Sequence, residues 1–406
     1  MLSFEDARKK VIDVVSGLRR VPATETIQLE NALGRVLAEE TTADRDYPPF
    51  DRATRDGFAV RAADCSKPGA RLRVIGEVQA GGSFARVIGT GECVQIMTGA
   101  AVPRGADAVV MVEHTGPGAT QDEVVVEMAA VAGLNFVPAG SESRAGDVLL
   151  RSRTRMGYAE IALAAQVGRS EFGVYRIPRI AILSTGNEVV PLTARPGPFE
   201  IRNSNGASLA AQVRVAGGEP VLLGNAPDRS EELQQMCERG LAEDALILSG
   251  GISMGKYDLV EDVLRNLGTE FAFDSVAIRP GRPASFGICR GRPVFALPGN
   301  PVSTMVTFEL FATAAIDILC GMDPRPLPLM KATLEKAVDQ KAPLTHFLPA
   351  KVEWCDGEAV VAESSWQGSG DIATLARGNC FLVVHQAKRT LAAGDLVDVL
   401  PRRGLL

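Results

Sequence analysis

Three short loops contain residue types that are suited to holding a charged ligand. They are TGNE (185–188), GGISMG (250–255) and PGNP (298–301), and each follows an apolar run that predicts a buried strand. Glycine lets the backbone approach a ligand closely, and successive backbone N–H groups can hold an anion. One such loop alone is typical of an ordinary turn. Three loops at one sheet edge favour a ligand site.

Carboxylates accompany these loops. Glu188, Asp228 and Asp258 fall in or beside loops that follow predicted strands. Converging carboxylates repel one another unless a cation or a shared proton lies between them. Their oxygens suit Mg²⁺, which binds a few carboxylates together with substrate phosphate. The alternative is three separate caps or surface ions, and Asp258 is equally suited to cap the helix after it.

Two arginines flank a stiff turn in the segment RPGRP. Arg279 and Arg282 follow a strand that we expect to end near Ala277, so they reach the same sheet edge. Their guanidinium groups could form a fork for an oxyanion, although most arginine pairs are solvated turns. In a more β-rich region, Asp56 and Thr98 each precede a glycine, which by itself is typical of a turn.

The elements around the loops alternate between strand and helix from Arg179 onward. Apolar runs at 179–184, 219–223, 244–249, 270–277 and 293–297 predict strands. Residues 207–216, 230–242, 258–267 and 302–320 have the spacing of helices. This alternation predicts a doubly wound parallel sheet that is covered on both faces.

The rest of the chain has a different texture. Ser3 and Asp6 predict a helix start, and residues 31–40 and 156–167 predict two further helices. Short strands follow one another in two other regions. We therefore expect four domains: a helical linker domain (1–45 and 149–176), a mostly β insert domain (46–148), an α/β domain (177–324) and a C-terminal β domain (325–406).

Composition excludes several classes of protein. The chain has 406 residues, a formal charge of −6 and only 5% aromatic residues, which argues against a nucleic-acid partner. No apolar run approaches the roughly 20 residues of a membrane span, and no secretory signal is expected. Seven cysteines without a C-x-x-C motif and three histidines argue against a zinc site and for a cytoplasmic location. These features predict a cytoplasmic protein that binds a phosphate-containing ligand with Mg²⁺.

Taken together, the motifs resemble one family, the molybdopterin molybdenumtransferases, which include MoeA and the gephyrin E domain. The resemblance covers nearly the whole chain. Its motifs are PPFDRATRDGFAV (48–60), IMTGAAVP (96–103), LSTGNEVV (183–190), SGGISMGKYD (249–258), IRPGRPASFG (278–287), LPGNPVS (297–303), QGSGDI (367–372) and GNCF (378–381).

The resemblance implies a fold and a reaction. The central domain would be a molybdopterin-binding α/β domain similar to MogA and MoaB. Adenylylated molybdopterin would bind this domain with molybdate beside it, and Mg²⁺-dependent cleavage of the phosphoanhydride would give molybdenum-bearing molybdopterin and AMP. The chain would form a homodimer whose cleft is built from both protomers, with other proteins of molybdenum cofactor biosynthesis as further candidate partners.

The same resemblance implies roles for individual residues. Asp56 and Thr98 would face the α/β domain of the partner chain. Glu188, Asp228 and Asp258 would lie around the pterin and the Mg²⁺ site. The expected binding residues are Thr185, Gly186, Ser249, Gly250, Gly251, Ser253, Arg279, Arg282, Pro298, Pro301 and Ser369, the last of these near molybdate.

Three departures from the family pattern concern basic residues. The lysines of its K-P-G-K-P motif are Arg279 and Arg282 here, and the segment 135–143 lacks the usual basic run. The stretch LTHFLPAKV (344–352) lacks an arginine that often follows an aromatic residue. These departures leave two alternatives to the enzyme open: a scaffold paralogue that binds molybdopterin without inserting metal, and an enzyme that inserts tungstate.

Overall fold

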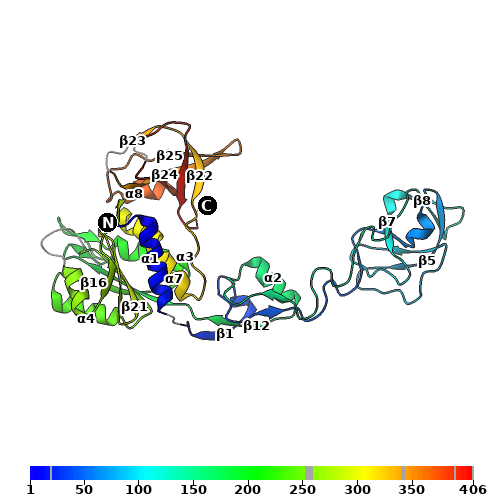
Figure 1. Ribbon diagram of the computed structural model, residues 1–406, viewed down its shortest axis with the longest axis horizontal. Coiled ribbons are helices and arrows are strands. Elements are labelled where there is room, and N and C mark those ends of the chain that lie inside the picture. Colours follow the sequence, from blue (N-terminus) through cyan, green and yellow to red (C-terminus); the bar gives the residue numbers. More distant parts are fainter. Residues whose placement is uncertain (19–20, 252–258, 340–342, 388–389, 405–406) are drawn as a thin grey trace. The chain divides into compact units, whose positions relative to one another are not determined.

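The computed structural model describes residues 1–18, 21–251, 259–339, 343–387 and 390–404. The predicted site residues Ser253 and Asp258 lie outside these ranges. The chain divides into two compact units (Figure 1). Unit 1 contains Met1–Ala38, Arg153–Gly157 and Phe172–Leu406, and unit 2 contains Glu39–Ser152 and Tyr158–Glu171.

A six-stranded sheet forms the centre of unit 1. Its order is β16 (Glu219–Ala226), β13 (Arg179–Thr185), β17 (Ala245–Ser249), β21 (Arg292–Leu297), β20 (Ser285–Cys289) and β18 (Glu270–Phe273). The first four strands are parallel, as predicted, and β20 is antiparallel to both of its neighbours. The strand predicted at 270–277 ends earlier, at Phe273, and belongs to this antiparallel extension.

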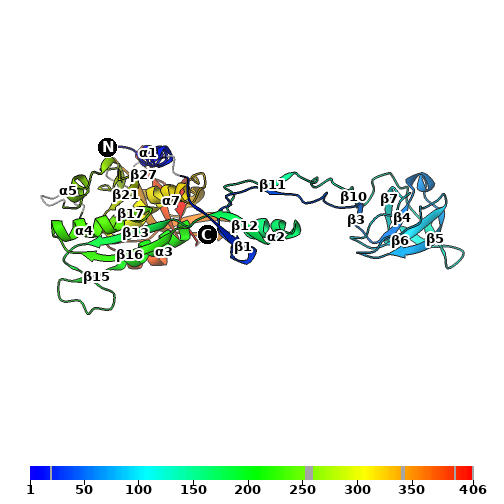
Figure 2. The ribbon, with the colours of Figure 1, turned by 90° about the horizontal axis from the view of Figure 1, so that it is seen from below.

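Helices cover both faces of this sheet, as the alternation predicts (Figures 1 and 2). On one face, Ile180 and Ile182 pack in a cluster with residues of α1 (Phe4–Gly17), α3 (Ser204–Ala216) and α6 (Pro301–Thr307). On the other face, Ala181 and Leu183 pack with α4 (Ser230–Gly240) and α5 (Leu259–Asn266). Successive strand residues point to opposite faces of the sheet. Because helices bury both faces here, apolar residues point to both faces and the run does not alternate with polar residues.

One long helical segment lies in the core of unit 1. It comprises α6, a π-helical turn at Phe308–Ala312 and α7 (Thr313–Leu319). Pro301–Leu319 is long and apolar enough to span a membrane by length and composition, but 89% of its most apolar window is buried inside the fold. That burial is typical of a core helix in a globular protein.

The N-terminal segment confirms one predicted helix start and corrects a helix prediction. Ser3 Oγ accepts a hydrogen bond from the Asp6 amide at 3.0 Å at the start of α1. The helix predicted at 31–40 is wrong: only a 3-10 turn, Leu29–Asn31, forms there. Gly34 has a φ of 77°, and Val36 and Leu37 form isolated bridges with Arg155 and Val174. Tertiary pairing therefore buries the apolar residues whose spacing suggested a helix.

The C-terminal part of unit 1 is a small barrel, as the short strands predicted. The sheet order is β19 (Ile278–Arg279), β24 (Thr345–Cys355), β25 (Glu358–Glu363), β22 (Met330–Leu334), β28 (Leu396–Pro401) and β26 (Cys380–Val384). A further pairing of β24 with β26 closes the ring. Helix α8 (Ile372–Arg377) and the short pair β23 (Val338–Asp339) and β27 (Thr390–Leu391) complete this part. In unit 1, β1 (Thr24–Gln28) also pairs with β12 (Glu171–Tyr175), and β14 (Val189–Val190) with β15 (Ile201–Arg202).

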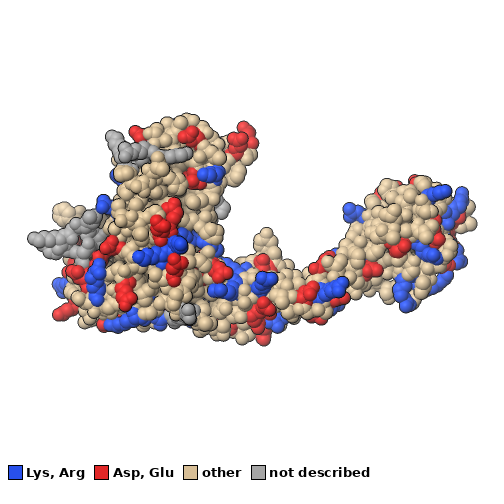
Figure 3. All heavy atoms as spheres, viewed as in Figure 1, with Lys and Arg blue, Asp and Glu red and all other residues tan. Residues whose placement is uncertain are grey.

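Unit 2 is mostly β, as predicted for this part of the chain. Its main sheet has the order β7 (Ala108–Met111), β4 (Gly57–Val60), β6 (Glu92–Ile96), β5 (Ala70–Val78), β9 (Glu123–Val126) and β8 (Thr115–Pro117). The two-stranded ladders are β10 (Phe136–Val137) with β3 (Arg52–Ala53) and β11 (Val148–Leu150) with β2 (Thr41–Thr42). Short turns η2 (Ala62–Cys65) and η3 (Val112–His114) and helix α2 (Tyr158–Gln166) complete it. In Figure 3 acidic and basic side chains are interspersed over the visible face of each unit.

Candidate functional site

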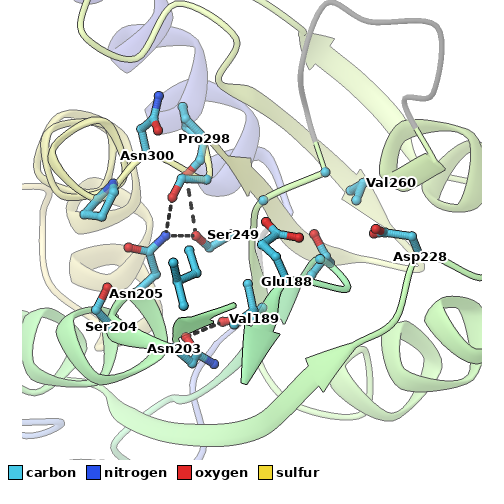
Figure 4. A pocket seen from close by; sticks show the side chains of 18 of the residues that line it. Glu188, Val189, Asn203, Ser204, Asn205, Asp228, Ser249, Val260, Pro298 and Asn300 are labelled. Carbon is cyan, nitrogen blue, oxygen red and sulfur yellow. Dashed lines mark hydrogen bonds between the residues drawn. The ribbon is translucent and has the colours of Figure 1, made fainter. Parts of the chain in front are cut away.

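The three predicted loops line one pocket at the carboxyl edge of the parallel strands. The pocket has a volume of about 1300 Å³ (Figure 4). We call it the glycine-loop pocket. It contains nine of the predicted site residues: Thr185, Gly186, Glu188, Asp228, Ser249, Gly250, Gly251, Pro298 and Pro301. The edge predicted from strand direction is therefore the edge at which these loops meet.

Two glycines are required by the shape of the pocket floor. Gly250 and Gly251 have φ angles of 102° and 67°, which side-chain-bearing residues rarely adopt. A Cβ atom on Gly250 would lie 2.7 Å from the carbonyl oxygen of Thr185. One on Gly251 would lie 2.8 Å from the Thr185 hydroxyl. The floor is therefore bare backbone, which a ligand can approach closely.

An asparagine that the sequence analysis did not single out connects two of the loops. Asn205 Nδ2 donates to Ser249 Oγ at 2.8 Å and to the carbonyl oxygen of Gly299 at 2.7 Å. Asn205 Oδ1 and the Thr185 hydroxyl are buried and have no hydrogen-bond partner among the described residues. These two groups give the pocket polar atoms that a ligand could satisfy. Asn205 lies in the first turn of α3, outside the three loops, so loop composition gave no signal for it.

The two described carboxylates of the predicted metal set both line the pocket, as Figure 4 shows. Their loops are joined by reciprocal hydrogen bonds. The backbone N–H of Asn187 donates to Asp228 Oδ2 at 3.2 Å, and the backbone N–H of Asp228 donates to Asn187 Oδ1 at 3.1 Å. Glu188 follows Asn187 directly. Within the described ranges, no group of three or more His, Cys, Asp or Glu side chains is placed to hold a metal ion. The third predicted acid, Asp258, lies outside those ranges.

A segment of the C-terminal barrel also reaches the pocket. The carbonyl oxygen of Ser369 accepts a hydrogen bond from the Val302 amide at 3.0 Å, beside the first turn of α6. Gly370 and Ile372 line the pocket. Asp371 begins α8, where the Thr374 amide donates to Oδ1 at 3.0 Å and the Thr374 hydroxyl to Oδ2 at 2.7 Å. These hydrogen bonds, with a further one from the Gln367 amide, hold the pKa of the Asp371 carboxyl below its usual value.

The basic residues are arranged differently from the sequence prediction. Arg279 and Arg282 are exposed, and neither lines the pocket, although the following Pro283 does. Arg202 is the one lysine or arginine among the described residues that line it, and its Nε donates to the Ala194 carbonyl oxygen at 3.2 Å. It lies on the short strand β15, and both residues of that strand are exposed. Two residues are too few to show a helical or strand periodicity, so no sequence signal marked Arg202.

In unit 2, Asp56 and Thr98 form a close pair. Asp56 Oδ1 accepts hydrogen bonds from the Thr98 amide at 2.6 Å and from the Thr98 hydroxyl at 2.8 Å. The amide bond first, and then the hydroxyl bond, keep the pKa of the Asp56 carboxyl below its usual value. Two motifs that are far apart in sequence therefore hold one carboxylate in a fixed position. Two independent turns would not need this contact.

Comparison with known family models matches three parts of the chain. Residues 2–168 match the MoeA N-terminal region (domain I and II), residues 181–317 match a probable molybdopterin binding domain, and residues 331–401 match the MoeA C-terminal region (domain IV). The second match covers β13, β17, β21 and the helices that form the glycine-loop pocket.

Whole-length relatives agree. A molybdopterin molybdenumtransferase of Staphylococcus aureus is 31% identical over 98% of this chain and 95% of its own, and one of Bacillus subtilis is 33% identical over 93% and 89%. Two solved MoeA structures from Pyrococcus horikoshii share the fold. One has a TM-score of 0.75 at 32% sequence identity and covers 99% of each chain. The other has a TM-score of 0.81 at 27% sequence identity and covers 99% of this chain and 100% of its own. The chain therefore belongs to the molybdopterin molybdenumtransferase family, the MoeA family, and has its multi-domain fold.

Proposed function

We propose that this transferase of molybdenum cofactor biosynthesis inserts molybdate into adenylylated molybdopterin, releasing AMP. The observation that supports this most directly is the convergence of three glycine- or proline-containing loops and three acidic side chains, those of Glu188, Asp228 and Asp262, on one large pocket. A volume of about 1300 Å³ exceeds the roughly 300–1000 Å³ of most small-molecule sites, as a pterin joined to a nucleotide requires.

The loops suggest how the substrate is bound. Gly250 and Gly251 line the pocket, and their backbone N–H groups would face phosphate oxygens. Ser249 is held by Asn205 and Pro298, so its hydroxyl offers a fixed polar contact. The Ser369 segment would place molybdate beside the bound pterin, which makes the capture of the metal an intramolecular step.

Mg²⁺ fits Glu188 and Asp228, the two described carboxylates of the predicted metal set. Their loops are joined by the Asn187–Asp228 hydrogen bonds, and a hard cation prefers a few carboxylates with substrate phosphate. Glu188 and Asp228 would hold it, with Asp258 as the third proposed ligand. When bound, Mg²⁺ would neutralise charge on the bridging phosphates during cleavage.

We also propose that the enzyme acts in the cytoplasm as a homodimer whose site is shared between protomers. Asp56 and Thr98 of one chain would act with the glycine-loop pocket of the other. The support is the resemblance of their motifs to the family and the single carboxylate that the pair presents. A fixed carboxylate with no described ion-pair partner is suited to contacting a group supplied from outside unit 2.

AMP release tests the reaction. Purified protein with adenylylated molybdopterin should release AMP only when molybdate and Mg²⁺ are both present. Asp228→Asn should lower kcat by about 100-fold, because it removes a carboxylate that would hold the Mg²⁺ needed to neutralise the reacting phosphates. Glu231→Gln, which changes an exposed acid of α4, is the control and should turn over normally. No AMP release under any condition would refute the enzyme proposal.

The same assay separates the two alternatives. Arg279 and Arg282 do not line the pocket, which supports the scaffold alternative. A scaffold would bind the pterin without releasing AMP. Tungstate in place of molybdate tests the other alternative, since the two oxyanions have the same charge. Faster AMP release with tungstate would assign the enzyme to tungsten.

Mixing two inactive variants tests the shared site. Asp56→Ala and Glu188→Ala each damage a different half of the proposed cleft. If the cleft is shared between protomers, a mixed dimer contains one intact site and AMP release returns. If each cleft lies within one chain, every site in the mixture stays damaged and no activity returns.

A further inference from the structure

Unit 1 contains a second pocket, which none of the proposed chemistry uses. It has a volume of about 760 Å³ and lies where the chain leaves α7 and enters the C-terminal barrel. Four guanidinium groups line it, those of Arg155, Arg325, Arg402 and Arg403. We call it the arginine pocket. No residue is shared between its lining and that of the glycine-loop pocket.

Carboxylates compensate only part of this positive charge. Arg325 pairs with Asp317 at 2.5 Å, and Arg403 pairs with Glu309 at 3.0 Å. Among the described residues, Arg155 and Arg402 have no acidic side chain within 4 Å. Arg402 Nε and Arg403 Nη2 are also buried without a hydrogen-bond acceptor in the described part of the chain. Buried donors normally find an acceptor, so this site lacks anionic oxygens.

Burial makes the excess charge costly. A fifth guanidinium, that of Arg8, donates to the carbonyl oxygen of Arg325 at 2.7 Å, and burial lowers its pKa to about 10. Burial also lowers the pKa values of Arg155 and Arg402. It also raises the pKa of Glu309, the partner of Arg403. Folding has already removed water from these cations, so an anion that enters does not have to desolvate them again. Several cations then stabilise it at once.

The walls of the pocket are apolar and include one aromatic ring. Trp354 lines it with 67% of its surface exposed, although tryptophan is usually well buried. Met330 and several prolines form other parts of the lining. A flat ring could stack on the indole while an attached anionic group contacts the guanidinium groups.

We propose that the arginine pocket binds a small organic anion in which a phosphate or carboxylate group is attached to a flat ring. Both head groups match the planar fork of arginine. The apolar walls favour an attached ring over a bare inorganic ion, because a bare ion gains nothing from Trp354 or Met330. The inference does not depend on the proposed reaction, since binding is measured without turnover.

Phenyl phosphate is the probe, and Trp354 is the reporter. The chain has two tryptophans, so Trp366→Phe leaves Trp354 as the single indole. Titration with phenyl phosphate should change its fluorescence saturably, with a Kd on the order of 0.1–1 mM. Arg155→Gln in the same background should weaken binding about tenfold, the loss of one charge-assisted hydrogen bond. Arg214→Gln, an exposed arginine of α3 outside the lining, should bind like the parent.

Related compounds identify the head group. Tighter binding of phenyl phosphate than of benzoate assigns a phosphate, and the reverse assigns a carboxylate; both results support the proposal. Equal binding of phenol would overturn it, because the anion would then contribute nothing. Absence of saturation in the parent, or equal weakening by Arg155→Gln and Arg214→Gln, would also overturn it. Binding seen only in a chain that ends at Gly404 would mean that the chain's own end fills the pocket.

Discussion

The two pockets of unit 1 are suited to anions for opposite reasons. The glycine-loop pocket has glycine backbone at Gly250 and Gly251, three described carboxylates and one described arginine. The arginine pocket has four guanidinium groups that two carboxylates only partly compensate. A pocket of the first kind binds an anion through backbone N–H groups and needs a cation to balance its acids. A pocket of the second kind supplies the positive charge itself.

This difference teaches where each pocket is vulnerable. The shape of the glycine-loop pocket depends on backbone conformation, so a single added methyl group should damage it. The arginine pocket depends on a balance of buried charges, so removing one carboxylate should destabilise the whole unit. The predictions below test these two dependences, from the largest expected effect to the smallest.

The largest effect is expected at the arginine pocket. Asp317 is fully buried and bonds Arg325 through both carboxylate oxygens. Asp317→Asn leaves the Arg325 guanidinium, whose side chain is 34% exposed, without its buried counter-charge, beside a cluster that already has excess positive charge. We expect the free energy of unfolding to fall by about 3–5 kcal/mol, measured by urea denaturation.

Asp323→Asn is the matched control. Asp323 lies in the segment that follows α7 and pairs with Arg153, but its side chain is 86% exposed. Exposed ion pairs contribute about 0–1 kcal/mol, so this variant should remain close to the parent. Equal stability of the two variants would show that charge balance does not govern this region.

The next largest effect is expected at the glycine-loop pocket. Gly250→Ala combines a φ of 102° with a Cβ atom 2.7 Å from the Thr185 carbonyl oxygen. Strain and overpacking together should cost about 2–4 kcal/mol. Gly268→Ala is the control, because its φ is 88° but no atom lies within 4 Å of the added Cβ. It should cost only the strain, about 1–2 kcal/mol. Urea denaturation of both variants measures the difference, and a Gly250→Ala cost no larger than that of Gly268→Ala would remove the steric argument.

The glycine-loop pocket was largely predictable from sequence, and the reason is physical. Apolar runs such as 179–184 are buried on both faces of a parallel sheet, so they mark strands without alternation. The carboxyl ends of parallel strands share one edge, which places the loop residues 185–188, 250–251 and 298–301 together. Asn205 could not be found this way, because its role depends on α3 bringing it to Ser249 and Gly299.

The arginine pocket was not predictable. Arg155, Arg325 and Arg403 are separated by at least 78 residues and follow no motif. Their proximity depends on how α7 and the barrel pack, which composition does not encode. The helix prediction at 31–40 failed for a related reason: Val36 and Leu37 are buried by bridges to residues more than 100 positions away. Local spacing cannot distinguish such burial from a helical face.

The smallest effect concerns pH. Asp371 fixes the segment that brings Gly370 to the glycine-loop pocket, and hydrogen bonds from Thr374 and Gln367 lower the pKa of its carboxyl from the usual 3.8. Because the folded pKa is the lower one, the stabilisation is fully present above about pH 3.8 and is lost as the pH falls through the folded pKa. In a Trp354→Phe chain, fluorescence of Trp366 beside this segment should therefore change below about pH 4.

Asp371→Asn separates this carboxylate from other acids that titrate at the same pH. An asparagine can still accept from the Thr374 amide, but it has no charge to lose, so the fluorescence change should disappear. An unchanged midpoint in that variant would mean that another acid controls the segment. Arginine stays protonated throughout this range, so phenyl phosphate binding at the arginine pocket should lose strength as the phosphate itself is protonated. The two pockets would then respond to acid through different partners: the first through its own carboxylate, and the second through its ligand.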